Sequence, residues 1–414
     1  MLGYRNPRLP RHVAPLLALC IALSASRAVA TVINVGPHRH FSNIAQAVQD
    51  ARPGDVIKVW PLAGGRPYRR VAIAMNKPRI TIESESRRKF IKINGRGFNY
   101  SGRGSIPRAI FQFNPGSSGC ILRGFDLSGA GNHAGNGAGV RINAANNIAI
   151  RHCYIHNNQM GIMSNGSFAR HSGARQVIEN CHITRNGTQL HAGYNHNLYL
   201  GGTSVLVRGC DISHSLTGHN LKSRAHLTEV EYCYIHDSAN RELDLVDARG
   251  TTDVPHSDAL VLGCIIVKKP HISGNEQVIN FGQDGGGNHT GTLYLVHNTI
   301  VTKYPAPIVT LSAPGARLDM IDNVIISNQH RATLVTAPHG PAGRRARGHG
   351  NQIPAAYGAL GRKLSGKPLP WRKIHLPWRA LHLRRQRLMR YVGVGRVAPR
   401  PGRRAGAGPL PGKR

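Results

Sequence analysis

A short pattern that recurs along most of the chain constrains its fold more than any other feature. The pattern is an apolar residue, two variable residues, a Cys, Asn or Phe marker, one variable residue, and Ile or Leu. Successive markers are separated by 28, 28, 29, 23, 31, 34 and 25 residues. The copies are LRGFDLS (122–128), IRHCYIH (150–156), IENCHIT (178–184), VRGCDIS (207–213), VEYCYIH (230–236), VLGCIIV (261–267), LVHNTIV (295–301) and MIDNVII (320–326).

A repeat of this length predicts a solenoid. One unit with short β-branched runs between Gly and Asn turns is too small to bury its own apolar face, whereas stacked neighbours bury it between them. Helical repeats are disfavoured because the apolar residues alternate over a few positions and Gly and Asn are frequent. We therefore expect an all-β chain of stacked parallel coils.

Five of the repeat markers are cysteines, and the stack gives them a place. Equivalent residues of parallel coils lie about 4.8 Å apart in a column, and small polarisable side chains fill such a column well. Six cysteines after an export signal would otherwise suggest three disulfides. We predict reduced, inward-facing thiols, because Phe and Asn occupy the same repeat position elsewhere; Cys120 lies off the pattern. The marker cysteines are Cys153, Cys181, Cys210, Cys233 and Cys264.

The two ends of the chain differ from the repeat region. Arg5, Arg8 and Arg11 precede an apolar run that ends in SRAVA, which predicts a signal peptide over residues 1–30 and a secreted or periplasmic product. Residues 341–414 hold 19 Lys and Arg and no acidic residue. We assign residues 31–335 to the coils and residues 336–414 to a basic Arg/Pro/Gly-rich tail, for which disorder is the leading interpretation. A polyanion-binding or membrane-surface arm and a shifted reading frame are the alternatives.

The segment SNIAQAVQDARPGD (42–55) predicts a helix that covers the first coil. Ile44, Ala47, Val48 and Ala51 recur at helical spacing, with Ser42 as the expected N-cap and Pro53–Gly54 as the stop. VIKVW (56–60) then predicts the first strand. A short amphipathic helix here would shield an otherwise open sheet edge.

This segment and the coils after it carry a resemblance to a known family. The pattern Ser/Asn-x-Ile-x-x-Ala-Val-x-x-Ala-x-Pro-Gly-Asp-x-Ile-x-Val resembles the right-handed parallel β-helix proteins of the pectate-lyase-like superfamily, over about residues 31–330. The resemblance implies a single-stranded right-handed parallel β-helix. It does not choose a function, because that superfamily holds lyases, hydrolases, epimerases and non-catalytic adhesins.

A second strand in each coil predicts a polar ladder on the outside. Aligning the inward residues Ile162, Leu198, Leu221 and Leu243 places one side chain per coil in an outward column, by the two-residue alternation of strands. That column holds Met163, Tyr199, Lys222 and Asp244. The residues one position before the inward ones are also expected to face out, namely Gly161, Asn197, Asn220 and Glu242. His196, His219, Arg224 and Arg241 lie at the strand ends.

Such a ladder suits chemistry on an acidic polysaccharide. Lyases of uronate polymers remove the C5 proton beside a carboxylate, so they need that carboxylate neutralised and a base close by. Lys222 is our first choice for the base, because neighbouring cations such as Arg224 would favour its neutral form. Arg224 or Tyr199 would serve the leaving group or hold the carboxylate, with His196 and His219 as further catalytic candidates. Asn197, Asn220 and Arg241 are the expected substrate-binding residues.

The same residues allow a calcium site. Asn220, Glu242 and Asp244 form an oxygen-rich set, which Ca²⁺ prefers. The arrangement resembles the Asn plus Glu-x-Glu calcium ligands of some β-helical lyases. The base lysine of that family follows the carboxylates, whereas Lys222 precedes them, so the chain departs from the family's pattern at this position.

Other functions remain open. An inert polar ladder, with Lys222 and Asp244 as an ordinary salt bridge, and a non-catalytic glycan-binding surface are the main alternatives. Residues 253–258 share letters with the Asp-Pro-His-Asp motif of β-helical epimerases, and Gly218-His219-Asn220 is a fragment of a hydrolase motif. The Gly-rich GQDGGGNH (282–289) lacks the Lys of a phosphate loop and is interpreted as a turn between coils.

The charge of the coil region narrows the partners. Residues 31–340 carry a net charge of +12, which favours anionic ligands. We expect an acidic polysaccharide, no specific nucleic acid and no transmembrane segment, and a monomer.

Overall fold

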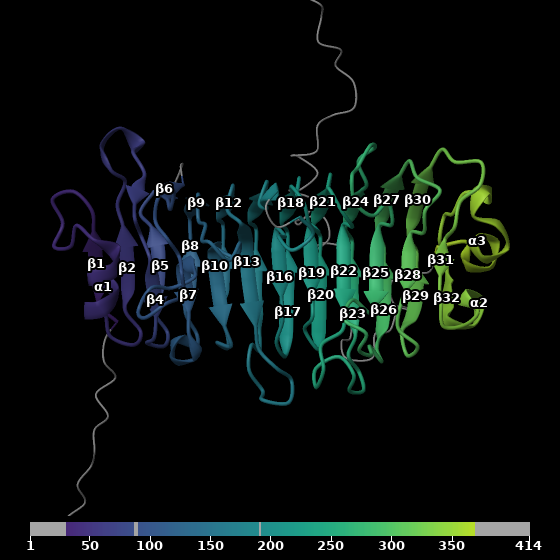
Figure 1. Cartoon of the computed structure of the whole chain (residues 1–414), viewed down its shortest axis with the longest axis horizontal. Helices are drawn as coiled ribbons and strands as arrows, with labels where there is room; N and C mark the ends of the chain where they lie inside the picture. Colours follow the sequence, from purple (N-terminus) through teal and green to yellow (C-terminus); the bar gives the residue numbers. More distant parts are fainter. Residues whose placement is uncertain (1–29, 87–89, 190–191, 369–414) are drawn as a thin grey trace, which may run out of the picture.

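The computed structural model describes residues 30–86, 90–189 and 192–368, so the predicted signal peptide lies outside the described residues. The described residues form three parallel sheets, here called sheets A, B and C, of 12, 10 and 10 strands. From β2 onward, successive strands of the chain go to sheets A, B and C in turn, and each pairs with its counterpart in the next coil. Figure 1 shows the coils stacked along the long axis, from β1 at one end to α3 at the other. The predicted right-handed parallel β-helix is confirmed.

Sheet A contains the strands in which the first apolar residue of each repeat lies. They are β1 (Val32–Val35), β2 (Val56–Val59), β5 (Thr81–Ser84), β8 (Ile121–Arg123), β11 (Ala149–Arg151), β14 (Gln176–Glu179), β17 (Ser204–Arg208), β20 (Leu227–Glu231), β23 (Ala259–Leu262), β26 (Thr292–Val296), β29 (Arg317–Ile321) and β32 (Ala346–His349).

Sheet B follows after a tight corner. Its strands are β3 (Tyr68–Arg69), β6 (Ile91–Asn94), β9 (Phe125–Ser128), β12 (Tyr154–His156), β15 (His182–Thr184), β18 (Asp211–Ser213), β21 (Tyr234–His236), β24 (Ile265–Val267), β27 (Thr299–Thr302) and β30 (Val324–Ser327).

Sheet C carries the predicted polar ladder. Its strands are β4 (Ile73–Met75), β7 (Ala109–Phe113), β10 (Ala138–Asn143), β13 (Met160–Asn165), β16 (Leu198–Leu200), β19 (Leu221–Ser223), β22 (Leu243–Val246), β25 (Ile279–Gly282), β28 (Val309–Leu311) and β31 (Val335–Thr336). Short 3₁₀ turns lie at Ala63–Gly65, Pro115–Ser117 and Ala355–Tyr357.

The repeated pattern is the corner between sheets A and B, and its marker residues form one internal column. The amide N–H of Cys181 donates to Sγ of Cys210 at 3.4 Å, and Cys153, Cys210 and Cys233 repeat this contact with the next coil at 3.4–3.5 Å. Cys264 donates in the same way to Oδ1 of Asn298 at 2.9 Å. All six cysteines among the described residues are free and buried. The prediction of a reduced, stacked column is therefore confirmed.

The N-terminal end is covered by the helix α1 (Ile44–Asp50). Ile44, Ala47 and Val48 are buried, as their spacing predicts. The N-cap is Asn43 and not Ser42, because the Asn43 carboxamide accepts the N–H of Ala45 at 2.7 Å. The first strand is also earlier than predicted: β1 pairs with β2 along its whole length.

The C-terminal end carries one more coil than the sequence indicated. The predicted boundary at residue 335 is too early, because β32 pairs with β29. Asn351 extends the corner column by accepting the N–H of Asn323 at 2.9 Å. The helices α2 (Ala342–Arg345) and α3 (Gly358–Leu364) belong to this end, where Tyr357 and Leu364 are buried. The rest of the predicted tail, residues 369–414, lies outside the described residues.

Candidate active site

The outward column predicted on sheet C has the expected register. Met163 pairs with Tyr199, Tyr199 with Lys222, and Lys222 with Asp244. The column continues through Arg141 and Gln112 on the N-terminal side and through Asn280 on the C-terminal side. These side chains therefore follow one another along a single face of the solenoid.

Asp244 is the centre of a charged cluster on this face. Its carboxylate is fully buried and lies 3.2 Å from Nζ of Lys222 and 3.1 Å from Nη1 of Arg241. It also lies 3.2 Å from Nε2 of His219 and accepts a hydrogen bond from Nδ2 of Asn280 at 3.1 Å. Arg241 and Asn280 donate hydrogen bonds to Oδ1, and Lys222 and His219 lie 3.2 Å from Oδ2, so these contacts hold the surrounding side chains in position.

A second carboxylate, from Asp284, lies between Lys222 and Arg224. Nη2 of Arg224 is 2.6 Å from Oδ2 of Asp284, and Nζ of Lys222 forms an ion pair with the same oxygen. Nε of Arg224 donates to the hydroxyl of Tyr199 at 3.0 Å. The cluster thus presents an exposed carboxylate held by two cations next to a phenol.

Asp284 reaches the cluster because its loop is tied to Asp247. The carboxylate of Asp247 accepts the N–H groups of Asp284, Gly285 and Gly287 at 2.6, 3.0 and 2.9 Å. A Cβ on Gly287 would lie 2.4 Å from Oδ2 of Asp247, so this approach requires glycine. The segment is the turn between coils that the sequence predicted, but its role at the site was missed. Its position directly after a strand of sheet C was the available signal.

The two predicted histidines are buried beside the cluster. The rings of His196 and His219 are stacked with centroids 5.1 Å apart. Nδ1 of His196 accepts the backbone N–H of His219 at 3.0 Å, which leaves the ring proton on Nε2. Burial is the main cause that holds the pKa of both rings well below the ordinary value, followed by nearby cationic groups. Both imidazoles are therefore neutral near pH 7.

The second predicted outward column faces inward instead. The side chains of Asn197, Asn220 and Glu242 are fully buried. Nδ2 of Asn197 donates to Oδ1 of Asn220 at 2.8 Å, and Nδ2 of Asn220 donates to Oε2 of Glu242 at 2.6 Å. Asn158 and Asn186 continue this internal ladder toward the N-terminus. Each of Asn197, Asn220 and Glu242 lies just before its strand, in the turn after sheet B, where the alternation of strands no longer applies.

This arrangement separates the predicted calcium ligands. Glu242 lies inside the solenoid, where it faces the buried ammonium group of Lys268 at 3.9 Å. Of the three predicted ligands, only Asp244 lies in the charged cluster on sheet C, where Lys222 and Arg241 contact its carboxylate. The set of Asn220, Glu242 and Asp244 does not come together as one group of oxygen ligands. The expected outward position of Asn197 and Asn220 is wrong, because both side chains are buried inside the solenoid. Arg241 does lie at the cluster, held by Asp244 and by Oε1 of Gln277.

The epimerase-like segment does not form a cluster of its own. Asp258 is buried and accepts the N–H of Thr292 at 2.7 Å, whereas Asp253 and His256 are exposed.

Another histidine group lies on sheet B. There His236 is hydrogen-bonded to Asp211 at 3.3 Å and to Asp237 at 2.7 Å, with His214 beside it.

Comparisons with known proteins give similarity in fold. The sequence matches no protein-family model, and no curated protein matches it at a significant level. Among solved structures, an alginate lyase from Paenibacillus sp. str. FPU-7 has a TM-score of 0.49 at 16% identity, covering 75% of this chain and 98% of that one. The pectate lyase Pel9A has a TM-score of 0.43 at 12% identity, covering 78% and 80%. A pectin methylesterase from Yersinia enterocolitica has a TM-score of 0.38 at 12% identity, covering 76% and 95%.

Along the described residues, no helix is long and apolar enough to cross a membrane. The successive A, B and C strands, the in-register columns and the helix-covered first coil all belong to one architecture. The chain is a right-handed parallel β-helix.

Proposed function

We propose that this chain binds an acidic polysaccharide along sheet C and cleaves it by β-elimination. The observation that carries the proposal is the Asp284 carboxylate held by Lys222 and Arg224 beside Tyr199. Two cations that hold a protein carboxylate on an exposed face offer the same contacts to the carboxylate of a uronate residue.

In the proposed reaction, the substrate carboxylate takes the place of Asp284. Lys222 and Arg224 then neutralise its charge, which stabilises the negative charge that develops when the C5 proton leaves. Tyr199, in its phenolate form, removes that proton and donates it to the departing glycosidic oxygen. The C4–O4 bond breaks, a C4–C5 double bond forms, and the proton moves from C5 to O4.

The surroundings of Lys222 favour this role over that of the base. The sequence predicts cationic neighbours for Lys222, whereas in the structure the carboxylates of Asp244 and Asp284 contact its ammonium group. An ammonium group held between two carboxylates has its donors directed at anionic oxygens, which suits a contact to the substrate carboxylate. Tyr199 is placed for the proton transfer, because Nε of Arg224 donates to its hydroxyl and holds it beside the position proposed for the substrate carboxylate.

The neutral histidines have a supporting role in this scheme. His219 contacts Asp244, and the ring of His196 accepts the backbone N–H of His219. Together they hold Asp244, and Asp244 holds Lys222 in the column. They act as positioning residues.

A non-catalytic glycan-binding protein is the second candidate. It is favoured by the fact that each cation of the cluster already has an acidic partner in the protein: Lys222 and Arg241 have Asp244, and Arg224 has Asp284. On such a surface, a ligand carboxylate could replace the protein carboxylate at each cation, and the ligand would be bound without being cleaved.

The test is to incubate the protein with alginate, with pectate and with glycosaminoglycans, and to follow the ultraviolet absorbance of the unsaturated uronate. Tyr199→Phe keeps the ring but removes the proton carrier, so it should abolish product formation and leave polymer binding largely intact. A glycoside hydrolase would release reducing ends without the absorbance. Binding without a change in chain length on any of these polymers would overturn the lyase proposal and favour the binding protein.

A further inference from the structure

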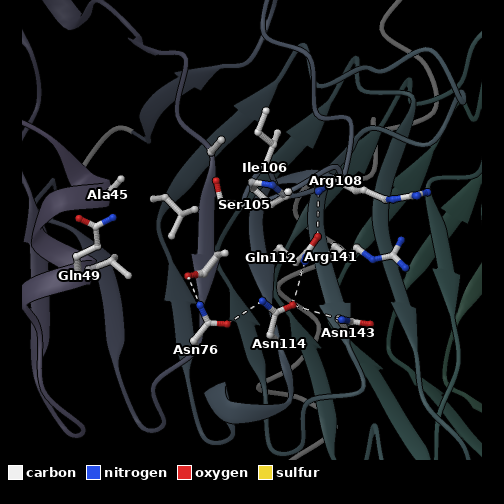
Figure 2. Close-up of a pocket in the computed structure, with 17 residues that line it drawn as sticks. Ala45, Gln49, Asn76, Ser105, Ile106, Arg108, Gln112, Asn114, Arg141 and Asn143 are labelled. Carbon is white, nitrogen blue, oxygen red and sulfur yellow. Dashed lines mark hydrogen bonds between the residues drawn. The ribbon is translucent and has the colours of Figure 1, made fainter.

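A second cationic pocket lies on the same face, nearer the N-terminus. It has a volume of about 650 Å³ and is bounded by α1, by the loop before β7, and by β4, β7 and β10. Figure 2 shows Arg108 and Arg141 at its rim, with both guanidinium groups pointing away from the helix and toward the later coils. Gln112, Asn114 and Asn143 supply amide groups to its floor.

The two arginines of this pocket lack acidic partners. In the part of the chain that the structure describes, neither Arg108 nor Arg141 forms a salt bridge, and the pocket lining contains no Asp or Glu. Nη1 of Arg141 contacts Sδ of Met163 at 3.2 Å, which is a weak acceptor. Burial, and then the charge of Arg108, lower the pKa of Arg141. Two guanidinium groups brought together without a carboxylate form a site for an anion.

The polar side chains of the pocket are already ordered by one another. The N–H of Arg108 donates to Oε1 of Gln112 at 3.0 Å, and Nε2 of Gln112 donates to Oδ1 of Asn114 at 2.9 Å. Asn143 donates to the same oxygen at 3.3 Å. These bonds are among the dashed lines of Figure 2. They fix the floor of the pocket and leave the guanidinium groups available to a ligand.

The register of sheet C connects this pocket to the charged cluster. Arg141 pairs with Met163, Met163 with Tyr199, and Tyr199 with Lys222. Three strand spacings correspond to about 14 Å, the length of a few sugar residues. Between the two charged places lies a cavity of about 340 Å³ lined by Met160, Met163, Tyr194 and Tyr199, and Tyr194 is 80% exposed. Aromatic and thioether side chains of this kind suit the apolar faces of sugar rings.

We infer that Arg108 and Arg141 form a distal subsite that binds the carboxylate of a second uronate residue, a few sugars away from the one held at Lys222 and Arg224. This inference rests on the proposed function for the identity of the ligand as a polyuronate. It specifies the substrate class as a linear chain longer than a disaccharide. It also predicts that short oligomers, which reach only one of the two carboxylate sites, bind more weakly.

The test compares Tyr199→Phe, which binds the polymer without forming product, with the triple variant Arg108→Gln/Arg141→Gln/Tyr199→Phe in binding of defined oligouronates by titration calorimetry at low salt. Long oligomers should lose roughly tenfold or more in affinity, because charge-assisted hydrogen bonds are removed. A disaccharide of the same uronate should bind both proteins equally. Arg123→Gln, which removes one positive charge on sheet A, is the control in the Tyr199→Phe background and should change neither affinity.

The outcomes separate this inference from the proposed reaction. Equal losses for disaccharide and long oligomer, or no loss beyond that of the control, would overturn the distal subsite even if the protein forms unsaturated product. Conversely, a loss confined to long oligomers with no product formed by wild type would support the subsite and overturn the lyase. Failure of wild type to bind any oligouronate would overturn both.

Discussion

The buried pair of Glu242 and Lys268 gives the sharpest test of how this solenoid is stabilised. Both side chains are fully buried, with Nζ of Lys268 3.9 Å from Oε1 of Glu242. Burial raises the pKa of Glu242 against the opposing effect of Lys268, and burial lowers the pKa of Lys268 against the opposing effect of Glu242. Each charge therefore depends on the other.

Single substitutions should each cost more than the pair does together. Glu242→Gln leaves Lys268 without its counter-ion, and it turns an amide donor toward Nδ2 of Asn220, which now donates to the carboxylate at 2.6 Å. Lys268→Met leaves the buried Glu242 carboxylate without its counter-ion. Removal of one partner of a buried pair costs about 3–5 kcal/mol. Replacement of both by uncharged groups of similar volume is often close to neutral, so the double variant should be less destabilised than the sum of the singles.

The assay is thermal unfolding of the full chain by calorimetry, with the midpoint compared across the two single variants and the double variant. A cost of this size should lower the midpoint by on the order of 10 °C. The control is Lys58→Met in the Lys58–Glu85 pair, where the ions are 3.0 Å apart but both side chains are about a third exposed; an exposed pair contributes about 0–1 kcal/mol. Single variants of the buried pair that unfold within the range of this control would refute the reasoning.

Three further predictions concern other parts of the molecule. Burial alone would lower the pKa of His236, but hydrogen bonds to Asp211 and Asp237 outweigh it and raise the pKa to about 9. The stabilisation from this shift is therefore complete below the unfolded-state pKa of about 6.5 and is lost as the pH rises toward 9. His236→Gln should therefore reduce the fall of the unfolding midpoint between these two pH values. A fall as large as that of wild type would contradict this. Burial holds the pKa of the Cys210 thiol well above its ordinary value, so a thiol reagent should label it only after unfolding, and labelling of the native chain would disprove the closed column. Asp284→Asn removes the internal carboxylate from the cluster and should tighten binding of a polyuronate severalfold, as measured by calorimetry at fixed salt, whereas weaker binding would show that Asp284 is part of the ligand site.

The repeat determined most of what could be predicted from the sequence. Because stacked coils place equivalent residues in register, the positions of Cys181 in the corner column and of Lys222 between Tyr199 and Asp244 followed from alignment alone. The last coil was missed because its basic composition suggested a tail. A further marker was nevertheless present, since Asn351 follows Asn323 by 28 residues.

The parts that failed depend on turns. Asn220 and Glu242 precede their strands by one residue, and the direction of a side chain in a turn is set by the bend of the backbone and not by alternation. Asp284 was missed because the path of a Gly-rich loop depends on a distant contact, the acceptance of its N–H groups by Asp247. A repeat carries no information about such a path.

The in-register stacking of sheet C fixes the distances between the side chains on this face. The separation between Arg141 and Lys222 equals a whole number of strand spacings and can change only when an entire coil is gained or lost. A point substitution changes the side chain at one position of the column but leaves the spacing between positions unchanged. Evolution of such a chain toward longer or shorter ligands would therefore proceed by discrete steps of one turn.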